Sequence, residues 1–175
     1  MNKNQDTIYA INHYNFFDKI LLKKRLEISS IINDTILDLQ IHDALDIGTT
    51  SDDKNASSNI VIKNIKNIDK FKCISDQIVN SDFFNKKLKK SITEEFSENE
   101  LYDFSSDLVV SNATIEHVGN TLNQKKMLEN VIKLTKKIFV ITTPNKFYPI
   151  ELHTKIPLIH WFPKSIYRKI LKFLG

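Results

Sequence analysis

Cysteine, glycine and proline are all scarce in this chain of 175 residues, which contains one cysteine, three glycines and four prolines. The single cysteine, Cys73, excludes an intrachain disulfide and a metal site built from several cysteines. The sequence has no apolar run of about 18 residues, the length that a transmembrane helix needs. Residues 1–15 lack the apolar stretch and cleavage site of a secretory signal, so we expect a cytoplasmic protein.

The composition is that of an ordinary globular protein, with 41% hydrophobic and 26% charged residues. The length fits one domain with a core of useful size. The net charge is +4, and its basic residues are mostly lysines scattered along the chain. Because they form no stripe interleaved with aromatic side chains, we do not expect nucleic acid as a partner. Binding to nucleic acid or to a membrane through lysine charge remains a third and weaker hypothesis.

The hydrophobic pattern predicts strands alternating with helices. Strands are predicted at residues 44–48, 71–75, 107–112 and 138–143, and another near 91–93. One or two helices are predicted within 16–40, and a short one over 59–67 with Ser57 and Ser58 as its caps. A further helix is predicted with Thr121 as its cap and Lys136 and Lys137 at its end. Its apolar face would consist of Leu128, Val131, Ile132 and Thr135. This alternation is typical of an α/β fold with a parallel sheet.

Gly48 ends the first predicted strand and begins a polar loop. Glycine lets the main chain turn sharply and lets a ligand approach closely, because it has no Cβ. In open α/β sheets, ligands lie outside the carboxyl ends of the strands, near the point where the topology reverses. The sequence therefore predicts a nucleotide-type pocket at residues 46–52.

Three blocks of sequence carry a family resemblance. They are Leu45 to Asp52, Ser106 to Val118, and Phe139 to Asn145 together with the stretch from His153 to Pro163. The first block matches the first motif of the class I S-adenosylmethionine-dependent methyltransferases, and the second block matches their fourth-strand motif. The third block resembles one subgroup. The chain thus resembles these enzymes, in particular the small methyltransferases described as type 11.

The resemblance implies a Rossmann-like, doubly wound and mainly parallel sheet with strand order 3-2-1-4-5, and S-adenosylmethionine lying across the strand tips. Carried over by position, the cofactor-binding residues would be Asp46, Gly48, Thr49, Asp76, Ser111 and Asn112. Asp46 and Gly48 would serve the methionine end, and Asp76 would accept hydrogen bonds from the ribose hydroxyls. A carboxylate suits that task because it only accepts hydrogen bonds.

His117 and Glu116 are the catalytic residues that the resemblance implies. His117 would act as a base if the methyl acceptor must lose a proton, since histidine commonly acts as a base near neutral pH. Alternatively, His117 only caps or packs the turn after the fourth strand. Glu116 would orient His117 or bind a metal, or it is simply solvated or bonded to the backbone. We expect no metal site, because Asp52 and Asp53 alone supply too few ligands.

The sequence departs from the family pattern at several points. Thr50 stands where a second glycine is usual, and Asp76 follows Asp46 by 30 positions, rather than about 20. The acid expected near the adenine is represented only by Glu94 and Glu95. We expect the C-terminal strand pair to be missing or truncated, and residues 146–175 or a partner chain to cover the edge of the fifth strand.

These observations divide the chain into a helical segment at 1–40, a Rossmann core at 41–145, and a proline-punctuated segment at 146–175. The last segment includes a basic amphipathic helix at 164–174, which either docks on its own domain or contacts a membrane surface peripherally. The leading hypothesis is a methyltransferase that acts on a small molecule or on a glycan or lipid precursor. The alternative is a catalytically inactive methyltransferase-like binding or assembly module.

Overall fold

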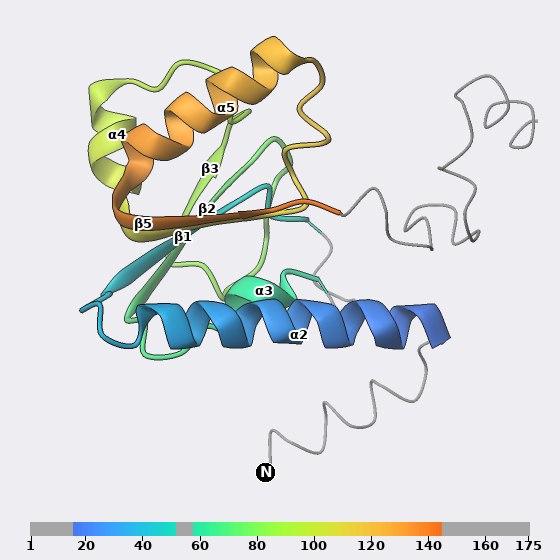
Figure 1. The fold of residues 1–175 in the computed structure, drawn as a ribbon. Coiled ribbons are helices and arrows are strands. Elements are labelled where there is room, and N and C mark those ends of the chain that lie inside the picture. The colour runs from blue at the N-terminus through green and yellow to red at the C-terminus, as the bar shows by residue number, and fades with distance from the viewer. Residues whose placement is uncertain (1–15, 52–57, 145–175) are drawn as a thin grey trace, which may run out of the picture. The chain divides into compact units, whose positions relative to one another are not determined.

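The computed structural model describes residues 16–51 and 58–144, which form a parallel sheet of five strands in the order β3-β2-β1-β4-β5 (Figure 1). The strands are β1 (Asp43–Ile47), β2 (Lys70–Ser75), β3 (Lys86–Lys89), β4 (Ser106–Asn112) and β5 (Thr135–Thr142). The predicted α/β class and the predicted strand order are confirmed. The chain divides into two compact units, Met1–Thr142 and Thr143–Gly175, and the sheet belongs to the first.

Helices cover both faces of the sheet, as Figure 1 shows. One face carries α2 (Phe16–Ile36) and α3 (Ile60–Lys63), and the other carries α4 (Glu98–Phe104) and α5 (Thr121–Leu134). The side chains of β1 alternate between the two: Ala44 packs in the cluster with α2 and α3, whereas Leu45 and Ile47 pack in the cluster with α5. Burial on both faces explains why the strands read as nearly continuous apolar runs.

The N-terminus of α5 differs by one position from the prediction. The cap is Asn120, whose side chain accepts a hydrogen bond from the backbone N–H of Asn123 at 3.0 Å, and Thr121 is the first helical residue. At the other end, β5 begins at Thr135, directly after the helix. The prediction that Lys136 and Lys137 end the helix was therefore wrong, because both lie in the strand.

The buried face of α5 is also rotated relative to the prediction. Its buried residues are Met127, Asn130, Val131 and Leu134. Leu128 and Ile132 were expected to face the core, yet their exposed fractions are 38% and 61%. The Asn130 side chain donates to the carbonyls of Ile92 and Glu94, at 2.7 and 2.9 Å. This polar contact fixes the rotation of the helix, and hydrophobic spacing alone cannot reveal it.

β3 was predicted at 91–93 but lies at Lys86–Lys89. Within it only Leu88 packs against the core, and three lysines fill the other positions. Charged residues are typical of an edge strand, which they protect from pairing with other chains. Because such a strand has almost no apolar pattern, the buried Ile92 that follows it gave the stronger signal.

The segment before α3 also departs from expectation. The helix spans only Ile60–Lys63 and is preceded by Asn59 in a left-handed conformation (φ 55°, ψ 24°), without a side-chain cap. The prediction of a cap at Ser58 was therefore wrong, and Ser57 lies outside the described residues. α4 was not predicted, although Ser97 and Glu100 form a capping box at its start.

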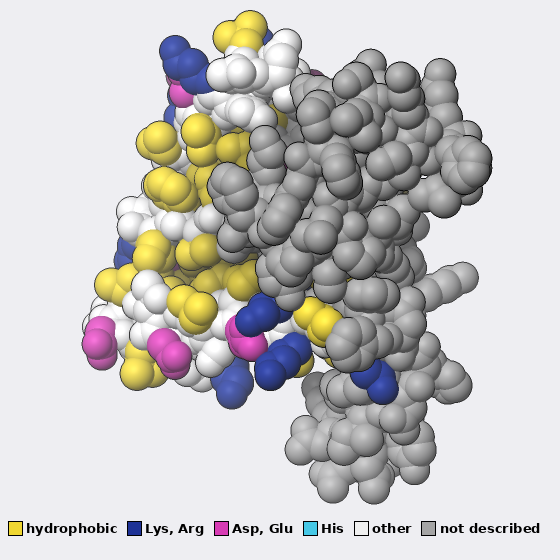
Figure 2. All heavy atoms as spheres, turned by 45° about the vertical axis from the view of Figure 1, so that its right-hand side comes forward, with side chains coloured by type: hydrophobic (Ala, Val, Ile, Leu, Met, Phe, Trp, Pro, Cys, Tyr) yellow, Lys and Arg dark blue, Asp and Glu magenta, His cyan; other side chains and the backbone are white. Residues whose placement is uncertain are grey.

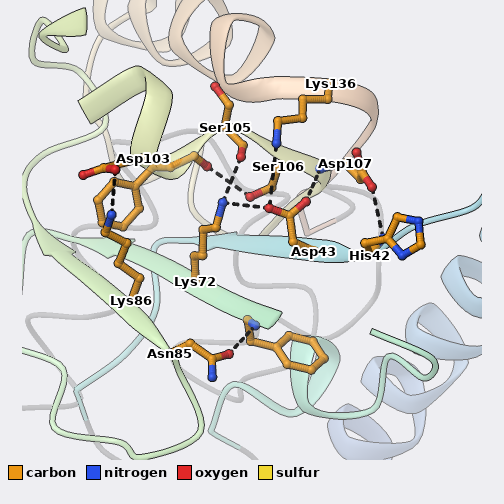
Figure 3. A network of polar contacts seen from close by, with 12 residues as sticks. His42, Asp43, Lys72, Asn85, Lys86, Asp103, Ser105, Ser106, Asp107 and Lys136 are labelled. Carbon is orange, nitrogen blue, oxygen red and sulfur yellow. Dashed lines mark hydrogen bonds and ion pairs between the residues drawn. The ribbon is translucent and has the colours of Figure 1, made fainter. Parts of the chain in front are cut away.

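A polar network ties the amino ends of the strands together (Figure 3). Lys72 of β2 forms an ion pair with Asp43 of β1 at 2.7 Å, and the exposed fractions of these side chains are 12% and 14%. The backbone N–H of Asp107 donates to Asp43 at 2.9 Å, and the backbone N–H of His42 donates to Asp107 at 3.0 Å. Lys136 lies 4.0 Å from Asp43. These contacts join β2, β1, β4 and β5.

We expect Lys72→Met to destabilise the protein by about 2 kcal/mol, because it leaves the Asp43 carboxylate largely buried without its nearest cation. Burial acts to raise the pKa of Asp43, but hydrogen bonds from Lys72 and the Asp107 amide outweigh it and lower that pKa. This stabilisation is therefore fully present above the ordinary pKa of aspartate, 3.8, and is lost as the pH falls from there through the lowered pKa of the folded protein. Urea unfolding at pH 7 measures the loss.

The matched control is Lys86→Met, which breaks the pair between Lys86 and Asp103 at 2.8 Å. These side chains are 44% and 45% exposed, so the pair should contribute less than about 1 kcal/mol. If the Lys72 and Lys86 variants lost equal free energies of unfolding, the buried ion pair at Asp43 would contribute no more to stability than an exposed one.

Apolar side chains are exposed near the β5 end of the described sheet. They include Leu128 and Ile132 of α5 and Phe139 of β5, which is 45% exposed. Figure 2 shows hydrophobic side chains gathered on the described part of one face. The expectation that residues 146–175 or a partner cover this edge stays a prediction. So do the expected lack of a C-terminal strand pair and the helix at 164–174, because residues 145–175 lie outside the described part of the chain. No helix within 16–51 or 58–144 is long and apolar enough to cross a membrane.

Candidate functional site

The candidate site lies at the carboxyl ends of β1, β2 and β4. From β1 the sheet continues to β2 and β3 on one side and to β4 and β5 on the other, so the topology reverses between β1 and β4. Ligands of open α/β sheets bind at such a point. The loop that leaves β1 there contains Gly48, Thr49, Thr50 and Ser51, and is called the β1 loop below.

Asp46 is buried beneath the β1 loop, with 7% of its surface exposed. Its carboxylate accepts a hydrogen bond of 2.7 Å from the hydroxyl of Thr49, which is itself buried. Burial raises the pKa of Asp46 to about 6, although the bond from Thr49 acts in the opposite direction. Two residues after Ala44, Asp46 lies on the α2 side of the sheet, beside Cys73 of β2. Asp46 therefore holds the β1 loop in place through its buried hydrogen bond with Thr49.

The β1 loop is also fastened to β2. The backbone N–H of Gly48 donates to the carbonyl of Ile74 at 2.9 Å, which extends the ladder one residue beyond β1. The hydroxyl of Ser75 donates to the carbonyl of Thr49 at 2.7 Å. Asp46, Gly48 and Thr49, three of the predicted cofactor-binding residues, are thus brought together at the tips of β1 and β2.

On the other side, Gly48 packs against the turn that follows β4. Its φ of +85° is in the left-handed region, and a Cβ added to it would lie 2.2 Å from the Thr114 hydroxyl oxygen. Thr114 donates a hydrogen bond to the carbonyl of Ile47 at 3.1 Å, and the buried Ser111 donates to the same carbonyl at 3.3 Å. The β4 turn therefore lies directly over the end of β1.

Asn112 ends β4 and is held by β5. Its side-chain oxygen accepts a hydrogen bond from the hydroxyl of Thr142 at 2.7 Å. The next residue, Ala113, has a positive φ of 55° and donates its N–H to the Thr142 carbonyl at 2.9 Å. This sharp reversal directs the chain back across β1. The described parts of the three blocks, residues 45–51, 106–118 and 139–144, therefore meet in one connected region.

Glu116 and His117 follow in the same turn. The backbone N–H of His117 donates to the carbonyl of Thr114 at 2.9 Å, which fixes the turn. The His117 side chain is exposed, and Glu116 is half-buried. The geometry thus places both residues next to the β1 and β4 tips, and their catalytic roles stay predictions.

Asp76 directly follows β2 and is exposed, so its carboxylate is open to a ligand. Its neighbour Gln77 was not singled out from the sequence, although it accepts hydrogen bonds from the N–H and the hydroxyl of Ser51, at 3.3 and 2.8 Å. Asn59 exchanges two hydrogen bonds with the backbone of Thr50. The sequence offered no signal for these contacts, because they join residues 9 and 26 positions apart.

The acids considered for the adenine side lie after β3. Glu94 accepts a hydrogen bond from the backbone N–H of Ser91 at 3.0 Å and thereby closes a local turn, and Glu95 is exposed. In the described part of the chain, no group of three or more His, Cys, Asp and Glu side chains is arranged to hold a metal ion.

No family model and no curated protein matches this chain. Among solved structures, it is similar to the N-methyltransferase NodS from Bradyrhizobium japonicum WM9, with a TM-score of 0.45 and 10% sequence identity. The similar region covers 70% of this chain and 64% of that protein, so the chain spans less than two thirds of its length. A likeness at this level carries no argument about activity.

Proposed function

We propose that the protein is an S-adenosylmethionine-dependent methyltransferase that acts on a small molecule or on a glycan or lipid precursor. The observation that carries the proposal is the meeting of the described parts of the three family-like blocks, residues 45–51, 106–118 and 139–144, at the tips of β1, β4 and β5. They meet in a sheet with the strand order that the resemblance implies. There Gly48 packs against Thr114, whose hydroxyl lies within hydrogen-bond distance of the Asn112 carbonyl, and Thr49 of the same loop donates to Asp46.

The exposed residues of the region fit the proposed cofactor. Asp76 offers an acceptor-only carboxylate for the two hydroxyls of a ribose. Gly48 lets the main chain turn next to the ligand, and Asp46 holds the loop through Thr49. When bound, S-adenosylmethionine supplies an activated methyl group from its sulfonium. The protein then has mainly to align the acceptor with that group, a contribution worth up to about 7–11 kcal/mol.

The exposed His117 is proposed to accept the proton that a hydroxyl or amine acceptor loses. It lies in the turn fixed by its own backbone bond to Thr114, next to the tip of β1. Glu116 is proposed to orient it. A base of this kind contributes about 10²–10⁴-fold to a rate, so His117→Ala should reduce turnover and leave cofactor affinity nearly unchanged.

The alternative, a catalytically inactive binding or assembly module, is favoured by one observation. The Asp46 carboxylate is buried and already bonded to Thr49, so it is not presented to a ligand. Binding of cofactor without turnover on any acceptor would support this alternative.

The test is isothermal titration of the folded protein with S-adenosylmethionine and S-adenosylhomocysteine. We expect micromolar binding, about −8 kcal/mol, and a loss of about tenfold or more in Asp76→Asn, which weakens hydrogen bonds to a charged acceptor. The matched control is Asp82→Asn, at another exposed aspartate in the segment after β2. No binding by the folded wild type would overturn the proposal, and equal losses in both variants would overturn the role of Asp76.

A further inference from the structure

We propose that Asn59 and Gln77 are positioning residues that hold the β1 loop in place and make the backbone N–H groups of Thr50 and Ser51 unavailable to a phosphate. They would make the site selective for a nucleoside ligand that presents no phosphate to this loop. The selectivity rests on the proposed function, whereas the locking of the loop can be tested without it.

Asn59 clamps Thr50 from both sides. Its side-chain oxygen accepts a hydrogen bond from the Thr50 N–H at 3.0 Å, and its side-chain nitrogen donates to the Thr50 carbonyl at 3.1 Å. Asn59 has a left-handed backbone conformation, which asparagine tolerates better than most residues. A residue at the start of a helix usually caps it, yet this side chain makes no capping bond to α3. Its carboxamide is instead bonded to the backbone of Thr50 in the β1 loop.

Gln77 clamps the next residue. Its side-chain oxygen accepts from both the N–H and the hydroxyl of Ser51, at 3.3 and 2.8 Å. The backbone of Gln77 is held in turn, because its N–H donates to the Ser75 hydroxyl at 3.1 Å, which donates to the Thr49 carbonyl. Thr49, Thr50 and Ser51 are thus held by the side chains of Ser75, Asn59 and Gln77, respectively.

These bonds decide which ligands the loop can accept. Turns that bind phosphate present unpaired backbone N–H groups to the anion, often in a glycine-rich loop. Here the N–H groups of Thr50 and Ser51 already point at carboxamide oxygens. A phosphate would have to displace Asn59 and Gln77, whereas a nucleoside bound through its ribose and a cationic sulfur would not. Thr50, which replaces the second family glycine, is compatible with this arrangement.

Amide hydrogen exchange measured by NMR tests the lock directly. Asn59→Ala should raise the exchange rate of the Thr50 amide about tenfold or more, and Gln77→Ala should do the same for Ser51. The matched control is Asn85→Ala, because the Asn85 side chain accepts a hydrogen bond of 2.8 Å from the N–H of Phe71, at the opposite end of β2 (Figure 3). An unchanged exchange rate of the Thr50 amide in Asn59→Ala and of the Ser51 amide in Gln77→Ala would overturn the proposal that these side chains hold the loop.

Ligand titration tests the selectivity with S-adenosylhomocysteine and inorganic pyrophosphate as probes. Affinity for the nucleoside should fall about five- to tenfold in the Asn59→Ala and Gln77→Ala variants, which lose about one net hydrogen bond's contribution. Gln77→Glu keeps the acceptor and should retain affinity, as should Asn85→Ala. If Asn85→Ala lost as much affinity for S-adenosylhomocysteine as the Asn59 and Gln77 variants, those two residues would act only through the stability of the fold. The proposal that they position the ligand site would then be overturned.

The two failures are distinguishable. If the folded wild type binds no S-adenosylhomocysteine, the proposed function fails, and the exchange rates of Thr50 and Ser51 still decide whether the loop is locked. If pyrophosphate shifts the Thr50 and Ser51 amide resonances of the wild type, the closure to phosphate is overturned even when the nucleoside binds.

Discussion

Replacing Gly48 by alanine is expected to destabilise the protein by about 3–4 kcal/mol. The left-handed backbone at φ +85° costs a residue with a Cβ about 1–2 kcal/mol. The new methyl group would also lie 2.2 Å from the hydroxyl oxygen and 2.5 Å from the methyl carbon of Thr114. Such overpacking costs about 1–3 kcal/mol. Thr114 cannot rotate away cheaply, because its hydroxyl is bonded to the carbonyl of Ile47. Urea unfolding of both proteins measures the difference.

Two further variants separate the backbone strain from the collision. Gly119 also has a positive φ, +101°, but its added Cβ would meet only the flexible end of Asn123, at 3.3 Å. Gly119→Ala should therefore show the strain alone, about 1–2 kcal/mol. In a double-mutant cycle, Thr114→Gly should recover about 1–3 kcal/mol of the Gly48→Ala loss. A Gly48→Ala protein no less stable than Gly119→Ala would mean that the β4 turn does not restrain the β1 loop.

The sequence was sufficient to predict the parts of this fold that depend on local patterns. Buried strands of a parallel sheet are short apolar runs, so β1, β2, β4 and β5 were located to within a few residues. The position of Gly48 at a strand end predicted the loop at the switch point, and the structure places Asp46, Thr49 and Asn112 in the same region.

The remaining parts depend on contacts between distant residues. The rotation of α5 follows from Asn130, whose side chain bonds to carbonyls 36 and 38 positions earlier. The clamps at Asn59 and Gln77 are polar side chains in exposed or half-exposed places, where composition gives no signal. The edge strand β3 has lysines in place of an apolar pattern. Hydrophobic periodicity in a sequence indicates which side of a helix or strand is buried, but it does not indicate which polar side chains form hydrogen bonds with each other.

Asp46→Asn is expected to gain stability relative to the wild type as the pH rises, by about 3 kcal/mol between pH 3 and pH 8. Burial raises the pKa of Asp46 from its ordinary value of 3.8 to about 6. For a raised folded-state pKa, the contribution to stability is fully present below the unfolded value and is lost as the pH rises through about 6. A shift of this size corresponds to about 3 kcal/mol. Asparagine does not ionise, so the stability of the Asp46→Asn variant does not fall as the pH rises through this range.

Urea unfolding of both proteins across this pH range measures the effect, and the titration of Asp46 itself can be followed by NMR of its carboxyl carbon. Thr49→Val is the matched variant: it removes the hydrogen bond that lowers the pKa of Asp46, so the midpoint should move upward. A stability difference independent of pH would show that Asp46 is not held in the buried state described. If Asp46→Asn gains stability as expected at pH 8 and also weakens cofactor binding, the carboxylate is retained for function at a cost in stability, a trade-off common at functional sites.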